Sequence, residues 1–182
     1  LSDDRPRTTW TFAELEPSLT SLAHGRSYVR AQRVFQFASC TACHRLDDVG
    51  KAVGPDLTKL DAKWTSSEVL RELLEPSKRI NEKFQTYSFE LDTGKIVNGL
   101  VVEETKTHVK VLENPLASPE PTLLRKTEIE DREKSKTSMM PQGLLDRLTA
   151  DEILDLIAYV LARGDRQNEL FQGGHHHHQH NH

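Results

Sequence analysis

Residues 40–44 read Cys40-Thr41-Ala42-Cys43-His44 and form the most informative motif of the chain. It holds the only two cysteines of the chain, so a framework of several disulfides is excluded. A structural zinc site would need further Cys or His residues at ligand spacing, and none lies close by. A thioredoxin-like pair would follow a strand and precede a helix, whereas here a helical pattern comes first and a loop follows. The two thiols and the imidazole therefore point to other chemistry.

The spacing of the pentapeptide is that of covalent haem attachment. Cys-x-x-Cys-His is the signature of c-type haem. Two thiols must reach vinyl groups on adjacent edges of one macrocycle, and two intervening residues set that span. The histidine that follows is carried beneath the iron, where it can serve as an axial ligand. We therefore predict one covalent haem c, attached at Cys40 and Cys43, with its iron bound by His44.

A helix is predicted immediately before the motif. Residues 24–39 contain no proline, and apolar side chains recur there at three-to-four spacing, at Val29, Val34, Phe35 and Ala38. A helix that ends at the first thiol would aim the Cys–His segment into a pocket. We expect Phe35 to pack against the haem edge or the C-terminal helix.

A loop is predicted immediately after the motif, because Gly50, Gly54 and Pro55 punctuate the sequence there. A ligating histidine nearly always donates its other ring N–H to an acceptor. The carbonyl of Pro55 is the candidate acceptor for His44, since proline stiffens the loop and keeps its C=O. A simple turn is the alternative interpretation.

The second axial ligand is sought among the methionines, because a thioether is the usual partner of histidine in electron-transfer haems. The chain has only two, Met139 and Met140, in a polar loop before Pro141. Core packing alone explains two methionines there poorly. Proline holds the preceding residue extended, which favours Met140 as the iron ligand and leaves Met139 beside the macrocycle. His108, in a strand-like stretch, is the rival ligand.

Two further helices are predicted outside the motif region. Residues 64–74 carry an apolar face, and Pro76 ends that helix. Residues 149–152 form a capping-box pattern, which is followed by an apolar helix near the C-terminus.

Between these helices the periodicity becomes alternating, which predicts strands. Four are expected, at 84–91, 95–103, 107–112 and 122–129. They would form a small antiparallel sheet or a partly closed barrel. We therefore predict a mainly α cytochrome c fold with an inserted β module, which is an α+β combination. The module could dock a partner, cover the haem or only stabilise the fold.

The predicted domain organisation is discontinuous. Residues 1–80 and 132–172 form the haem domain, and residues 81–131 form the inserted module. Residues 173–182 are rich in histidine and are interpreted as a purification tag, with a native metal-binding tail as the alternative. The chain starts at Leu1 rather than Met, so we expect a processed product or an excised domain.

Composition excludes two classes of partner. The formal net charge is −4, with acidic and basic residues interleaved, and nucleic-acid binding would need a clustered basic face. No apolar run approaches the roughly 18 residues that a spanning helix needs. We expect neither a nucleic-acid partner nor a membrane span in this chain.

Several separated motifs, in one order, resemble the haem-binding cytochrome c domain typical of Planctomycetes and Verrucomicrobia. The resemblance covers most of residues 10–171. Its carriers are Cys40-Thr41-Ala42-Cys43-His44, Val53-Gly54-Pro55-Asp56-Leu57-Thr58, Leu74-Glu75-Pro76-Ser77, Asp92-Thr93-Gly94-Lys95, Ser138-Met139-Met140-Pro141-Gln142-Gly143-Leu144-Leu145 and Asp155-Leu156-Ile157-Ala158-Tyr159-Val160. Ala31 departs from the family, which often has a glycine at that helix contact.

The resemblance implies a mono-haem domain with an inserted β module, with Met140 at the ligand position. It also implies electron transfer in the periplasm or otherwise outside the cytoplasm, with a separate redox partner protein or a fused dehydrogenase domain. We expect an electron-transfer protein rather than an enzyme, with no catalytic residues.

Candidate supports for the haem propionates are Trp64, Arg79 and Lys63. The rival function is a haem enzyme or gas-binding sensor with an open or weakly ligated distal site, since the β module could pull the methionines away. A module that acts purely through partner interaction, with the haem only structural, is the third possibility.

Overall fold

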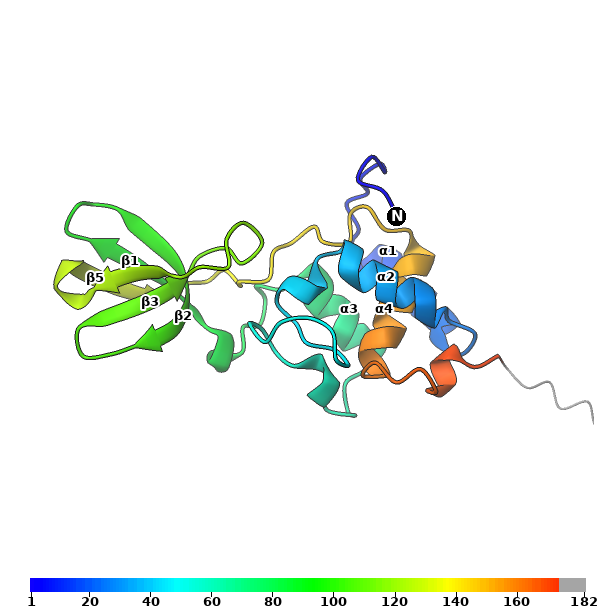
Figure 1. The fold of residues 1–182 in the computed structure, drawn as a ribbon. Coiled ribbons are helices and arrows are strands. Elements are labelled where there is room, and N and C mark those ends of the chain that lie inside the picture. Colours follow the sequence, from blue (N-terminus) through cyan, green and yellow to red (C-terminus); the bar gives the residue numbers. More distant parts are fainter. Residues whose placement is uncertain (174–182) are drawn as a thin grey trace, which may run out of the picture.

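The chain folds into two parts, a helical body and a separate β-sheet, joined by two connecting segments (Figure 1). The structure is a computed structural model that describes residues 1–173. Apart from its first residue, the predicted tag lies outside the described residues.

Four α-helices form the body: α1 (Phe12–Leu15), α2 (Tyr28–Phe37), α3 (Ser66–Leu74) and α4 (Ala150–Leu161). Capping boxes begin three of them, because Thr11, Thr65 and Thr149 each accept the amide of a glutamate three residues on. The predicted helices near 24–39, 64–74 and 150 are thus confirmed. Helix α1 and the 3₁₀ segment Glu16–Leu22 were not predicted, since one helical turn is too short to show periodicity.

Helix α4 is almost entirely buried, and α2 and α3 pack against it. Phe35 of α2 meets Tyr159 of α4 edge-to-face, with ring centroids 5.6 Å apart. Ala31 is fully buried, so this helix pair packs closely without a glycine there. Val29 is wrong as a core position: it is 49% exposed, because five residues place it about 140° around the helix from Val34.

A cluster of ion pairs holds the start of α2 against α4. The carboxylate of Asp155 is fully buried and accepts hydrogen bonds from Arg30 Nε at 2.5 Å and from the Ser27 amide at 3.1 Å. Arg26 binds Asp151 one turn earlier on α4, at 2.9 Å. Buried carboxylates are tolerated only when paired in this way. These contacts fix the position of α2, and the C-terminal end of α2 leads into residues 40–44.

The strands form one antiparallel sheet in the order β4-β3-β2-β1-β5. They are β1 (Thr86–Leu91), β2 (Ile96–Glu104), β3 (His108–Leu112), β4 (Thr122–Arg125) and β5 (Ile129–Lys134). All lie between α3 and α4 in the sequence. Strands occupy nearly as many residues as α-helices, so the molecule is a mixture of α and β rather than mainly α.

The predicted fourth strand, 122–129, is wrong in extent. Strand β4 ends at Arg125, a 3₁₀ turn covers Lys126–Glu128, and β5 follows. Strand β5 reads Ile-Glu-Asp-Arg-Glu-Lys and shows no alternation. It lies at an edge of the sheet, where charged residues discourage pairing with other chains, so apolar periodicity could not reveal it.

The sheet has a hydrophobic core of its own. Its buried members are Phe89, Leu91, Val97, Val109, Val111 and Leu124, and none of them belongs to the core of the helical body. Arg132 of β5 lies over the Tyr87 ring, 4.2 Å from its centroid, and pairs with Glu104 of β2 at 3.0 Å. This cation helps to cover the apolar face of the sheet.

Candidate functional site

The conformation of residues 40–44 is set by the abrupt termination of α2. Ser39 takes a left-handed conformation with φ of 61°, and the 3₁₀ turn Cys40–Ala42 follows at once. The His44 amide then donates to the carbonyl of Cys40 at 2.8 Å. This local turn holds both thiols and the imidazole at one cavity.

The following loop is hydrogen-bonded along the back of the motif. The amide of Lys51 donates to Thr41 O at 3.0 Å, and that of Gly54 donates to Cys43 O at 2.7 Å. Gly50 has φ of 97°, and a Cβ there would lie 2.0 Å from the carbonyl oxygen of His44. Only glycine fits that contact, so the loop and the motif form one rigid unit.

The imidazole of His44 is oriented by the loop. Its Nδ1 lies 2.9 Å from the carbonyl oxygen of Pro55, as predicted for the acceptor. A carbonyl can only accept, so Nδ1 carries the proton and Nε2 keeps a free lone pair. Burial lowers the pKa of His44, although the bond to Pro55 partly offsets this. A neutral imidazole is the form that binds a metal.

Neither Cys40 nor Cys43 forms a disulfide in the described part of the chain. Burial raises the pKa of Cys40 to about 12, and burial also raises the pKa of Cys43. Both therefore remain protonated at neutral pH. Within residues 1–173, no group of three or more His, Cys, Asp or Glu side chains could hold a metal ion, so the thiols have no set of protein ligands to join.

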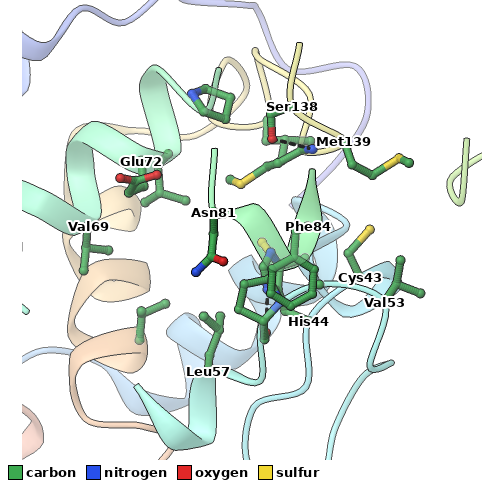
Figure 2. Close-up of a pocket in the computed structure, with 18 of the residues that line it drawn as sticks. Cys43, His44, Val53, Leu57, Val69, Glu72, Asn81, Phe84, Ser138 and Met139 are labelled. Atoms are coloured by element: carbon green, nitrogen blue, oxygen red, sulfur yellow. Dashed lines mark hydrogen bonds between the residues drawn. The ribbon is translucent and has the colours of Figure 1, made fainter. Parts of the chain in front are cut away.

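The motif opens onto a cavity of about 570 Å³ between the helical body and the sheet. Cofactor pockets typically measure about 300–1,000 Å³ and are mostly apolar. Figure 2 shows Ser138 and Met139 on one side of the cavity, with Cys43 and His44 on the other. Both methionines line it, although about a hundred residues separate them from the motif.

Some of the other predicted site residues line the cavity, and one does not. Phe35, Trp64 and Arg79 line the cavity, and Lys63 does not. The Arg79 guanidinium lies 5.4 Å from the centroid of the Trp64 ring and pairs with Glu72 at 2.9 Å. A protein carboxylate therefore already neutralises part of its charge.

His108, the rival ligand, lies in β3 outside the cavity. Its Nε2 is 3.0 Å from Glu103 Oε1, and its Nδ1 is 3.0 Å from Thr105 Oγ1. Both ring nitrogens are thus engaged in the turn between β2 and β3.

The cavity lining also includes residues that were not predicted, among them Asn81, Phe84, Leu100 and Leu116. Leu100 lies on the face of β2 opposite to Val97, and an apolar side chain on both faces of a strand could have signalled a second contact. Phe84 lies at the start of the predicted strand 84–91, but it belongs to the 3₁₀ turn Glu82–Phe84 that precedes β1. Asn81 comes just before that turn, where no periodicity marks it.

The residues present fit a haem. A largely apolar cavity brings together two protonated thiols, a neutral imidazole with a free Nε2, and a pair of thioethers. These are the attachment and ligand groups of c-type haem. Among the described residues, no hydrogen bond engages Nε2 of His44.

Comparison with known proteins agrees with this chemistry. Residues 28–91 match the family model for cytochrome c, a span that runs from α2 through the motif and α3 to β1. A comparison with curated proteins found no match. This match supports a haem-binding cytochrome c domain over that span, with covalently bound haem c and its iron as the cofactor. Among residues 1–173, no helix is long and apolar enough to cross a membrane.

Proposed function

We propose that this protein is a mono-haem electron-transfer cytochrome in which Cys40 and Cys43 form the thioether bonds. Each S–H would add across one vinyl double bond, so a protonated thiol supplies both atoms of the addition. His44 Nε2 and the thioether of Met140 would be the axial ligands. The haem supplies a one-electron redox couple when bound, and the protein tunes its potential through ligands and burial.

The observation that carries the proposal is the orientation of His44. Its Nδ1 is committed to Pro55 O, which leaves Nε2 as the only ring nitrogen available for a metal. The methionine segment lies across the same cavity. One imidazole and one thioether on opposite sides form the ligand pair typical of electron-transfer haems.

The surroundings of the two methionines favour Met140 as the ligand. Met140 packs against the core of the helical body, and its amide donates to Ser138 Oγ at 3.1 Å. Met139 has no such core contact among the described residues. Pro141 restricts the backbone of Met140. A thioether held in one direction suits ligation.

The remaining parts of the proposal rest on the family resemblance. We infer a haem domain formed by residues 1–80 and 132–172 with residues 81–131 inserted, working outside the cytoplasm. Its electrons would be exchanged with a redox partner protein or a fused dehydrogenase domain. Phe35, Trp64 and Arg79 would contact the macrocycle from the cavity wall.

Absorption spectra of the oxidised protein test the ligand assignment. We expect a weak sulfur–iron band at the red end in the wild type and in Met139→Ala, and its loss in Met140→Ala. Carbon monoxide should bind reduced Met140→Ala at least about tenfold more tightly, since loss of the thioether frees the sixth position. A wild type that is high-spin and binds carbon monoxide would instead support an enzyme or a gas sensor.

A further inference from the structure

The two segments that join the sheet to the helical body are bonded to each other. The Ser135 amide donates to Thr86 O at 2.9 Å. Gln85 Nε2 donates both to Ser135 O and to Thr86 O, at 2.8 Å each. The second segment, residues 135–138, leads directly to the two methionines. The sheet therefore begins and ends at a single hydrogen-bonded junction, formed by Gln85, Thr86 and Ser135, which we call the root of the sheet.

Thr86 connects this root to the methionine segment. It is a polar residue that is only 4% exposed, and its hydroxyl donates to Thr137 O at 2.7 Å. The next residue, Ser138, donates its amide to Ser77 Oγ at 3.0 Å and accepts the Met140 amide at 3.1 Å. A continuous set of short contacts thus runs from the sheet to Met140.

The same row of the sheet also forms part of the cavity wall. Thr86 on β1 is directly opposite Leu100 on β2, and Leu100 is opposite Leu112 on β3. Paired residues share a face of the sheet. Leu100 lines the cavity, so this face is turned toward the site. The hydroxyl of Thr86 therefore acts at the boundary between the sheet and the cavity.

We propose that Thr86 is a positioning residue for the distal side of the site. Its hydroxyl fixes the Thr137 carbonyl and thereby holds residues 137–140 at the cavity mouth. The proposal rests on the assignment of Met140 as a ligand. It gives the sheet a specific task, which is to keep the methionine segment in place.

The experiment compares four forms of the haem-loaded protein: wild type, Thr86→Val, Thr86→Ser and Thr122→Val. Thr122 is the control, because its hydroxyl also forms a hydrogen bond, to Glu113 beside β3. Thr122 lies on β4, which two strands separate from β1, and it does not line the cavity. One readout is the affinity of the oxidised protein for added imidazole, which competes with the thioether. The other readout is amide hydrogen exchange at Ser138 and Met140, which needs no ligation.

We expect imidazole to bind Thr86→Val about five- to tenfold more tightly than wild type, as one net hydrogen bond would predict. Exchange at Ser138 and Met140 should quicken, Thr86→Ser should restore both values, and Thr122→Val should change neither. If Thr86→Val does not fold, Gln85→Leu cuts the same root at a half-buried side chain and should act in the same direction.

Two results separate failure of this proposal from failure of the ligand assignment. Unchanged exchange and imidazole affinity in both Thr86→Val and Gln85→Leu would overturn the positioning role. Faster exchange in Thr86→Val, in a protein whose wild type lacks a sulfur–iron band, would support the positioning role and reject Met140 as the ligand.

Discussion

At the scale of single residues, the motif depends on two glycines that touch His44 in different places. A Cβ at Gly50 would meet the His44 carbonyl oxygen at 2.0 Å. A Cβ at Gly54 would lie 3.1 Å from Cε1 of the His44 ring. The first contact fixes the backbone of His44, and the second limits how its ring can rotate. Both support the bond from Nδ1 to Pro55.

Gly50→Ala should destabilise the haem-loaded protein by at least about 2 kcal/mol, because it combines left-handed strain with a backbone clash. Gly25→Ala is the matched control: Gly25 has φ of 72°, and a Cβ there would meet nothing within 4 Å. That control should cost about 1 kcal/mol. Guanidinium unfolding measures both. Equal losses would show that the close approach to His44 does not matter.

At the scale of elements, ion pairs tie the ends of the strands together. The carboxylate of Glu104, at the end of β2, binds Lys126 at 2.8 Å and Arg132 of β5 at 3.0 Å. The hydrogen bond from Lys126, followed by that from Arg132, holds the pKa of Glu104 below its ordinary value of 4.5. The folded sheet therefore releases this proton more readily than the unfolded chain does.

A carboxyl group whose pKa is lowered by folding stabilises the fold above its unfolded pKa, and this stabilisation is lost as the pH falls through its folded pKa. Glu104→Gln should therefore lower the melting temperature at pH 6 and flatten its decline below pH about 4.5. The exposed Glu130 of β5 supplies a control, Glu130→Gln. Thermal melts by circular dichroism between pH 3 and 6 measure the effect. Parallel curves for wild type and Glu104→Gln would contradict it.

At the scale of the whole molecule, the helical body and the sheet have separate cores that share no residue. The sheet also leaves and rejoins the body at one point, since Ser135 N lies 2.9 Å from Thr86 O. Adjacent ends are the usual condition for tolerated excision or insertion of a unit. The sheet nevertheless supplies Leu100 and Leu116 to the cavity wall.

Replacing residues 87–134 by a short glycine linker should therefore leave the helical body folded with its haem attached. Small reductants should react faster with this variant, since the cavity loses part of its apolar wall. Pyridine haemochrome spectra and far-UV circular dichroism check attachment and helix content. The double variant Leu100→Ala/Leu116→Ala in the full chain removes part of the apolar cavity wall and keeps the sheet. A faster reaction with small reductants in this variant would assign the effect to the wall. Loss of helix in the excised variant would refute independent folding.

Much of the chemistry could be predicted from local sequence. The spacing of Cys40, Cys43 and His44 is a property of five consecutive residues. The cap of α4 is equally local, since it joins Thr149 to Glu152. The acceptor role of Pro55 followed from loop punctuation close to the motif. Strand β5 and helix α1 could not be predicted, because every residue of β5 after Ile129 is charged and α1 is a single turn.

The local sequence is enough to predict the attachment motif, because its thiols and imidazole are neighbours in the chain and the turn after α2 brings them together. The groups that face this motif across the cavity depend on tertiary packing. Long-range packing brings the methionine segment to the same cavity, and the alternating faces of β2 turn Leu100 toward it. The anchor between Thr86 and Thr137 joins residues 51 positions apart. No local pattern encodes such a contact, since it exists only once the sheet has closed on its root.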